Sequence, residues 1–305
     1  MAGYGEVESG TFIDVPDLLE SKLSDTAISR GLGHFIHPND EHAAAQFSVT
    51  AVQILEKLSA LIPANPMGTY STESSEWKYS TSRTKKKLQE EQICDYFNAI
   101  ADRVCEEYGV ASDASGLRKF ASMDKPPAGI PMNSKRKPDG VVLDSELSNT
   151  EENEADWSDM HAIMRLRVTA DSASFNSAFR QILDNARMIF CSQRIRRFVL
   201  GVIFISDNTM AFCVFDRSGV LCTERFDIMN DPEKLIRVVV GLLFADLIDL
   251  GYDPTVTVRV NEGGDGASKK EVVVALKNVE YTIERTLQCG AINSRTGDDL
   301  LPYRT

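Results

Sequence analysis

The segment Phe198–Ile205 (FVLGVIFI) restricts the fold more than any other part of the sequence. It is an unbroken apolar run with several β-branched residues, which predicts a buried strand. Two further strand patterns follow, Met210–Phe215 and Val220–Phe226, and the turn sequence Asp216–Gly219 between them predicts a hairpin. The domain around this segment therefore contains a sheet.

Patterns with helical spacing alternate with these strands along the chain. Helices are predicted at residues 43–61, 85–108, 175–191 and 232–250, and further strands at 138–143, 161–168, 255–260 and 271–276, with a strand or short helix at 281–287. The order predicts an α/β or α+β domain, a mixed sheet flanked by helices, at residues 85–292. A helical and loop extension at residues 1–84 precedes it, and a short tail at 293–305 follows.

The charge and the cysteines narrow the class of protein. There are 45 acidic and 33 basic residues, a net charge of −12, which argues against a generic nucleic-acid coat but leaves a local basic groove open. The longest apolar run, within Val238–Ala245, is far shorter than the ~20 residues of a membrane helix. The six cysteines are scattered without a C-x-x-C motif, so we expect reduced core thiols in an intracellular protein, cytoplasmic or nuclear, with no membrane partner.

A candidate catalytic residue, Asp139, opens the strand predicted at 138–143. In PD-(D/E)XK nucleases such an Asp and an acidic-x-Lys triplet on the next strand hold a divalent metal and orient the attacking water. Here the triplet is Arg165-Leu166-Arg167, and a guanidinium repels Mg²⁺ instead of binding it. Asp139 is therefore a weak candidate, and we expect no metal site and no cofactor. The alternative is a turn residue capped by local backbone bonds.

Arginines are concentrated on one side of the acidic stretch Asp144–Asp159. Seven arginines and two aspartates lie between Met160 and Leu200, whereas residues 144–159 hold seven acidic and no basic residues. The two regions are expected to pair within the molecule. Alternatively, the arginines bind phosphate, nucleic acid or an acidic partner. The candidates for that role are Arg165, Arg167, Arg194, Arg196 and Arg197.

Six sequence blocks occur in a fixed order along the chain. They begin at Lys137 (KPDGVV), Asp156 (DWSDMHAI), Arg196 (RRFVLG), Phe215 (FDRSGV), Arg237 (RVVVGLLF) and Leu250 (LGYDPTV). In this order the chain resembles the amino-terminal part of the fungal-type protein kinases, over about residues 85–295. The resemblance implies a fungal source and a region that precedes, or begins, a kinase-like domain.

The sequence departs from that family where the resemblance ends. Asn293-Ser-Arg295 continues as Thr296-Gly297, whereas the resemblance implies a Ser-Arg-Gly-Thr-like loop and then a full catalytic domain. The chain contains no His-Arg-Asp and no Asp-Phe-Gly, which phosphoryl transfer by a protein kinase requires. Val274–Lys277 imitates the Val-Ala-Ile-Lys strand, which makes Lys277 a second weak catalytic candidate; we interpret it as a lysine at a strand end.

These observations predict a truncated or divergent kinase-like pseudoenzyme without activity of its own, acting as an interaction or regulatory module. Its expected partner is another protein or a kinase lobe outside this chain. The alternatives are a degenerate nuclease with a PD-(D/E)XK-like fold and an Arg-lined domain that binds phosphate or nucleic acid.

Overall fold

The computed structural model describes residues 11–60, 70–77, 86–128, 136–148, 155–167, 172–205, 208–262, 268–276 and 279–282. The chain divides into two compact units, Met1–Asp253 and Pro254–Thr305. The helices and most of the strands belong to the first unit. The predicted tail at 293–305 and the candidate Lys277 lie outside the described residues.

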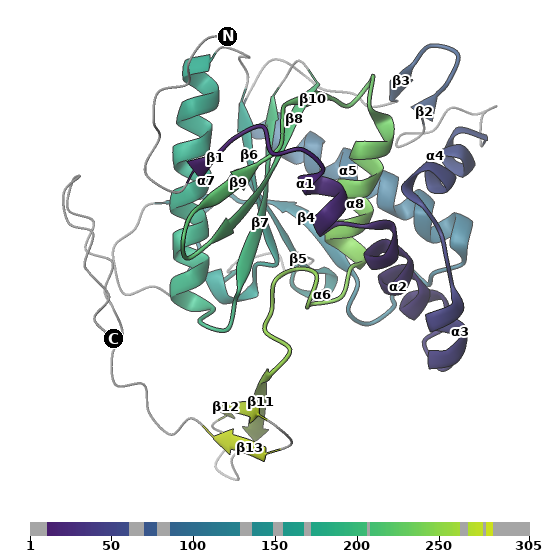
Figure 1. Cartoon of the computed structure of the whole chain (residues 1–305). Helices are drawn as coiled ribbons and strands as arrows, with labels where there is room; N and C mark the ends of the chain where they lie inside the picture. The colour runs from purple at the N-terminus through teal and green to yellow at the C-terminus, as the bar shows by residue number, and fades with distance from the viewer. Residues whose placement is uncertain are drawn as a thin grey trace. The chain divides into compact units, whose positions relative to one another are not determined.

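An eight-stranded sheet forms the centre of the first unit (Figure 1). Its strands are β1 (Thr11–Phe12), β4 (Arg118–Ser122), β5 (Gly140–Asp144), β6 (Ala162–Arg167), β7 (Phe198–Ile205), β8 (Thr209–Asp216), β9 (Val220–Cys222) and β10 (Phe226–Asp227). They run in the order β1-β9-β8-β7-β6-β5-β4, and β10 pairs with β8. Strands β6 and β7 are parallel, whereas β4, β5 and β6 pair antiparallel, as do β7, β8 and β9. The predicted mixed sheet is therefore confirmed.

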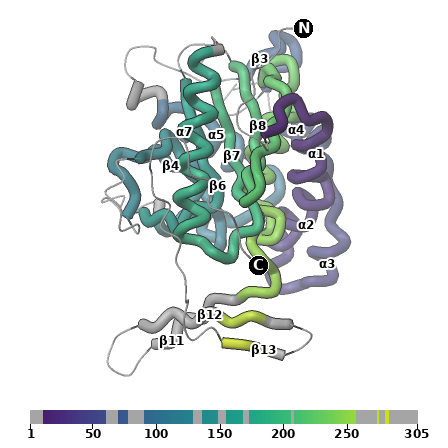
Figure 2. The backbone as a smooth tube through the Cα atoms, turned by 60° about the vertical axis from the view of Figure 1, so that its left-hand side comes forward, coloured from purple at the N-terminus to yellow at the C-terminus, as the bar shows by residue number. Residues whose placement is uncertain are grey.

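Helices cover both faces of this sheet (Figures 1 and 2). On one face lie α7 (Ser172–Ser192) and the short 3₁₀ helix η1 (Trp157–Asp159); on the other lie α5 (Lys86–Tyr108) and α8 (Pro232–Phe244). Successive side chains of a strand point to opposite faces. Met164 of β6 accordingly packs in the core beneath α5 and α8, while its neighbour Ile163 packs beneath α7. The sheet is thus buried on both sides, as an apolar strand such as β7 requires.

The amino-terminal helices share the core of the sheet domain. They are α1 (Leu18–Lys22), α2 (Asp25–Ile36), α3 (Glu41–Gln46) and α4 (Ala51–Ala60), and a small hairpin of β2 (Tyr70–Ser71) and β3 (Glu76–Trp77) follows. Gly31 of α2 packs so closely on α8 that a Cβ there would lie 2.1 Å from the carbonyl oxygen of Phe244. Residues 1–84, predicted as an extension, thus belong to the same compact unit as the sheet.

Two predicted helices are shorter in the structure. The helix expected at 43–61 is divided, because Thr50 and Gln53 form a reciprocal cap that starts α4. The helix expected at 232–250 ends at Phe244, and a turn follows in which the backbone N–H of Leu250 bonds the carbonyl of Asp246. In both places a local hydrogen bond interrupts an apolar pattern that by itself would continue the helix.

The second unit is a three-stranded antiparallel sheet of β11 (Val256–Glu262), β12 (Ser268–Leu276) and β13 (Val279–Thr282). Strands β11 and β12 confirm two predicted strands. Strand β13 shows that the ambiguous segment at 281–287 begins in a strand, and its remainder lies outside the described residues.

One prediction about the cysteines is wrong. Cys213 and Cys222, expected as reduced thiols, form a disulfide between β8 and β9. They face each other directly in the antiparallel register, with 4.3 Å between their Cα atoms, and this pairing was not visible in their sequence spacing. Cys94, Cys105 and Cys191 are not disulfide-bonded. Among the described helices, none combines the length and the apolar character that crossing a membrane would need.

Candidate functional site

Asp139 lies directly before β5 and is 1% exposed. Its carboxylate accepts a hydrogen bond from the backbone N–H of Leu166 at 2.7 Å and pairs with the guanidinium of Arg165 at 2.9 Å. Both partners belong to the neighbouring strand β6. The sequence analysis expected local turn bonds for Asp139, whereas these two contacts of its side chain reach across the sheet.

Arg165 stands at the position in the triplet where a PD-(D/E)XK nuclease has its second metal-binding carboxylate. Besides Asp139, its guanidinium donates to the backbone carbonyl of Lys137 at 2.9 Å and to the side-chain oxygen of Gln181 on α7. Burial lowers the pKa of Arg165, and the adjacent Asp139 acts in the opposite direction. The charges of Asp139 and Arg165 thus compensate each other, and three acceptors, on Asp139, Lys137 and Gln181, hold the guanidinium in place.

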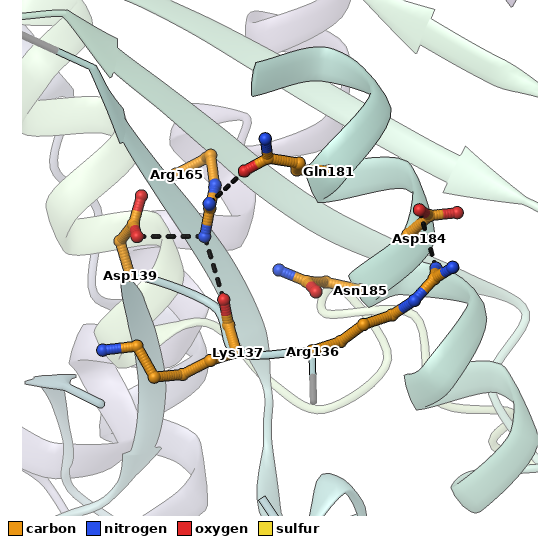
Figure 3. A pocket seen from close by; sticks show the side chains of 7 residues that line it. All are labelled: Arg136, Lys137, Asp139, Arg165, Gln181, Asp184 and Asn185. Atoms are coloured by element: carbon orange, nitrogen blue, oxygen red, sulfur yellow. Dashed lines mark hydrogen bonds and ion pairs between the residues drawn. The ribbon is translucent and has the colours of Figure 1, made fainter. Parts of the chain in front are cut away.

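A cavity of about 350 Å³ opens beside this ion pair (Figure 3). The residues that line it come from the segment before β5, from β6 and from α7: Arg136, Lys137, Asp139, Arg165, Gln181, Asp184 and Asn185. On its rim, Arg136 pairs with Asp184 at 2.7 Å, and both side chains are partly exposed. The cavity is therefore lined almost entirely by charged and amide groups.

Lys137 connects this cavity to the helix α5 on the other face of the sheet. Its ammonium group donates to the backbone carbonyl of Met123 and lies 3.7 Å from the carboxylate of Glu90. Glu90 is buried on α5, and the sequence analysis did not single it out. It brings a second buried carboxylate to the neighbourhood of Asp139.

Asn185 is the most unusual polar group at the cavity. It is 2% exposed, and its side-chain nitrogen has no hydrogen-bond partner among the described residues. Gln181, Asp184 and Asn185 recur at the i, i+3 and i+4 spacing that places them on one side of α7. This polar spacing within an otherwise amphipathic helix is visible in the sequence and could have indicated the site.

The five predicted anion-binding arginines do not form one cluster. Strands β6 and β7 are parallel, with Ala162 opposite Leu200 and Arg167 opposite Ile205. Arg165 and Arg167 therefore lie near the carboxyl end of β6, whereas Arg194, Arg196 and Arg197 precede the start of β7. About 20 Å of extended strand separates the two groups.

Arg196 belongs to a second buried network at that far end. Its guanidinium is almost fully buried, donates to the carbonyl of His161 at 2.6 Å and stacks on the ring of Tyr252 at 4.1 Å. The imidazole of His161 bonds Asp144 through Nε2 at 3.0 Å and Tyr252 through Nδ1 at 3.1 Å. Burial lowers the pKa of His161, as do the cations of Arg118 and Arg196, while Asp144 opposes them. Arg196 thus has a structural role here.

The proposed pairing of the arginines with the acidic stretch has a limited counterpart. Arg165 pairs with Asp139, outside that stretch. Within it, Asp156 and Asp159 form a capping box around η1, and Asp144 bonds His161. Residues 149–154, which hold three of the seven acidic residues, lie outside the described part of the chain.

Comparison with known proteins gives one match. A family model described as fungal protein kinase matches residues 137–295, slightly more than half of the chain. The matched region begins at Lys137, so it includes Asp139, Arg165 and the pocket-lining residues of α7, but not Glu90 on α5. No curated protein and no solved structure gives a significant match.

Proposed function

Since the chain belongs to the fungal protein kinase family, we propose that its α/β unit serves this family as a non-catalytic interaction or regulatory module. One observation carries the proposal: the buried Asp139, where metal-dependent chemistry would be centred, is paired with Arg165 at 2.9 Å. The proposed partner is another protein or a kinase lobe outside this chain.

The Asp139–Arg165 pair supports a binding role because a metal ion would have to displace a firmly held cation. The guanidinium has three acceptors, namely Asp139, the carbonyl of Lys137 and the side chain of Gln181. Removing it would leave these acceptors to be satisfied in a buried site, which costs free energy. The residue types that transfer a phosphoryl group in kinases, the Asp of His-Arg-Asp and of Asp-Phe-Gly, also have no counterpart in residues 1–305.

A phosphotransfer assay tests this proposal. The purified chain is incubated with labelled ATP, Mg²⁺ and a general protein substrate, beside the Lys277→Ala and Asp139→Asn variants. We expect no transfer above background in any of the three. Mg²⁺-dependent transfer by the parent chain that Lys277→Ala abolishes would overturn the proposal.

The nuclease alternative is tested with the same proteins. Single- and double-stranded DNA is incubated with the chain in Mg²⁺ or Mn²⁺, and Asp184→Asn serves as the control because it removes a carboxylate from the rim of the same cavity. We expect all variants to leave the DNA intact. Cleavage that Asp139→Asn abolishes and Asp184→Asn retains would establish the degenerate nuclease instead.

A further inference from the structure

The cavity beside the Asp139–Arg165 pair holds two buried N–H donors that have no acceptor among the described residues, and we propose that they bind a neutral carboxamide group. The donors are the side-chain nitrogen Nδ2 of Asn185 on α7 and the guanidinium nitrogen Nε of Arg165 on β6. Both side chains line the cavity (Figure 3). The inference goes beyond the proposed function and does not depend on it, since binding a carboxamide requires neither the presence nor the absence of catalysis.

The first donor, Nδ2 of Asn185, is shielded from water without gaining an acceptor. Asn185 is 2% exposed, and Nδ2 has no hydrogen-bond partner among the described residues. A buried amide donor without an acceptor is destabilising. Figure 3 shows this amide directed from α7 into the cavity, toward the side where Arg165 and the backbone carbonyl of Lys137 lie. A ligand with an acceptor atom in the cavity would therefore remove the cost.

The second donor belongs to a guanidinium whose other two nitrogens already have acceptors. Nη1 of Arg165 contacts Asp139 and the backbone carbonyl of Lys137, both at 2.9 Å, and Nη2 donates to Gln181. Nε is buried and has no partner among the described residues. Because the other nitrogens are held by three acceptors, Nε keeps a fixed position from which it can donate to a ligand.

The two donors lie close enough to serve one small ligand. Gln181 accepts from Arg165 and precedes Asn185 by four residues on α7. Side chains at that spacing are neighbours, with about 5–6 Å between their Cβ atoms. Arg165 therefore reaches α7 one helical turn from Asn185. A ligand placed between them can accept from both, because a carbonyl oxygen has two lone pairs.

The ligand should be uncharged, because the charged groups of the cavity already have partners. The carboxylate of Asp139 compensates Arg165. Figure 3 shows the guanidinium of Arg136 turned to Asp184 and the ammonium group of Lys137 on the opposite side, so neither points to the centre of the cavity. An anion would meet the carboxylates of Asp139 and Asp184, which line the same cavity, without an unpaired cation to attract it.

A carboxamide matches this site better than a ketone or an ester. Its carbonyl oxygen accepts hydrogen bonds and its NH2 group donates them, which is complementary to Asn185, where Nδ2 donates and Oδ1 accepts. The backbone carbonyl of Lys137 accepts from Arg165 and has a second lone pair for a ligand N–H. A cavity of about 350 Å³ has room for such a group, which can belong to a small amide or to a Gln or Asn side chain of another protein.

NMR titration of the isotope-labelled full chain measures this binding. The probes are acetamide and N-acetylglutamine methylamide, which distinguish a small amide from the side chain of a protein. The references are N,N-dimethylacetamide, which keeps the carbonyl but has no N–H, and acetate, which is an anion. We expect at least one amide probe to shift the side-chain amide signal of Asn185, with a dissociation constant on the order of millimolar.

The references define the outcomes that count against the proposal. N,N-dimethylacetamide should bind about tenfold more weakly than acetamide, since it cannot donate to Oδ1 of Asn185, and acetate should cause no shift. Absence of a shift with both amide probes would overturn the proposal. Equal binding of N,N-dimethylacetamide, or tighter binding of acetate than of acetamide, would overturn it as well.

A substitution then locates the site. Asn185→Leu replaces the amide by an apolar group of similar size, so the Nε–H signal of Arg165 should no longer respond to the amide probes. The denaturation midpoint should not fall, because a buried donor without an acceptor is removed. Arg180→Gln is the matched control: it removes an exposed arginine of α7 that does not line the cavity, and binding should stay unchanged.

Unchanged amide binding in Asn185→Leu would refute the cavity as the site. The comparison of the probes uses the unchanged chain, so it decides the proposal even if this variant fails to fold.

Discussion

Two arginines lie near opposite ends of strand β6, Arg165 partly buried and Arg196 fully buried, and the two are held in different ways. At one end, Arg165 faces a buried carboxylate, Asp139. At the other, Arg196 donates to backbone carbonyls and stacks on Tyr252, while the nearby carboxylate of Asp144 bonds His161. Arg165 compensates the charge of Asp139. Arg196 instead bonds backbone carbonyls and stacks on an aromatic ring. The difference predicts unequal costs when either is removed.

Replacing Arg165 should have the largest effect. Arg165→Met removes the guanidinium that lies 2.9 Å from the buried carboxylate of Asp139, and breaking a buried ion pair in this way costs about 3–5 kcal/mol. Denaturant unfolding monitored by circular dichroism measures the loss. The double variant Asp139→Asn/Arg165→Met should recover most of it. Arg180→Gln, which removes an exposed arginine from α7, is the control. If Arg165→Met is no less stable than this control, the pair of Asp139 with Arg165 contributes nothing to stability.

Replacing Arg196 should cost less, although it is at least as well buried. Arg196→Met removes hydrogen bonds to the carbonyls of His161 and Phe198 and the stacking on Tyr252, for which about 1–3 kcal/mol is expected. None of these partners of Arg196 is a carboxylate. The same denaturant experiment decides: if Arg196→Met destabilises more than Arg165→Met, charge compensation is not what distinguishes the two ends.

The stability of the protein should depend on pH through the end of β6 where His161 lies. Asp144 on β5, Tyr252 after α8, Arg118 on β4 and Arg196 before β7 surround His161, and burial lowers its pKa from the ordinary value of 6.5. The bond to Asp144 places the proton on Nε2 and leaves Nδ1 to accept from the Tyr252 hydroxyl, which is the neutral form of the ring.

The sign of the pH effect follows from this lowered pKa. As pH falls through 6.5, the unfolded chain takes up a proton on His161 that the folded chain resists, so stability decreases on acidification. The pKa of Asp144 is lowered as well, chiefly by its bond to His161, so more stability is lost below its ordinary value of 3.8. Unfolding free energies at about pH 7.5 and 5.5 measure the first step.

A matched pair of histidine variants checks the assignment. His161→Gln, which keeps an N–H donor for Asp144, should flatten the dependence of stability on pH between about 7.5 and 5.5. His34→Gln removes an exposed imidazole and should leave the slope unchanged. A slope that survives in His161→Gln and disappears in His34→Gln would place the titration elsewhere.

The sequence predicted the sheet more completely than the site because strands depend on local pattern and the site on register. The apolar run of β7, the hairpin of β8 and β9 and the helix α7 could each be recognised from adjacent residues. The contact between Asp139 and Arg165 depends on the antiparallel pairing of β5 with β6, which no local pattern specifies. For the same reason Glu90 was missed: it precedes Lys137 by 137 − 90 = 47 residues of chain, a separation that only folding closes.

The arginines show that residues close together in the sequence can also be far apart in the fold. Arg165 and Arg196 look equivalent in sequence, as members of one basic stretch, but the parallel pairing of β6 with β7 places them at opposite ends of these two neighbouring strands. Composition therefore indicated a basic surface where the fold has two separate buried groups.

The smallest expected effect on stability belongs to the rim of the cavity. Asp184→Asn breaks the pair with Arg136, in which both side chains are partly exposed, so the free energy of unfolding should change by less than about 0.5–1 kcal/mol. Arg165→Met acts on a less exposed ion pair that lines the same cavity, so the two variants compare an exposed and a largely buried pair of one site. A loss for Asp184→Asn as large as that for Arg165→Met would mean that the rim pair contributes as much stability as the pair of Asp139 with Arg165.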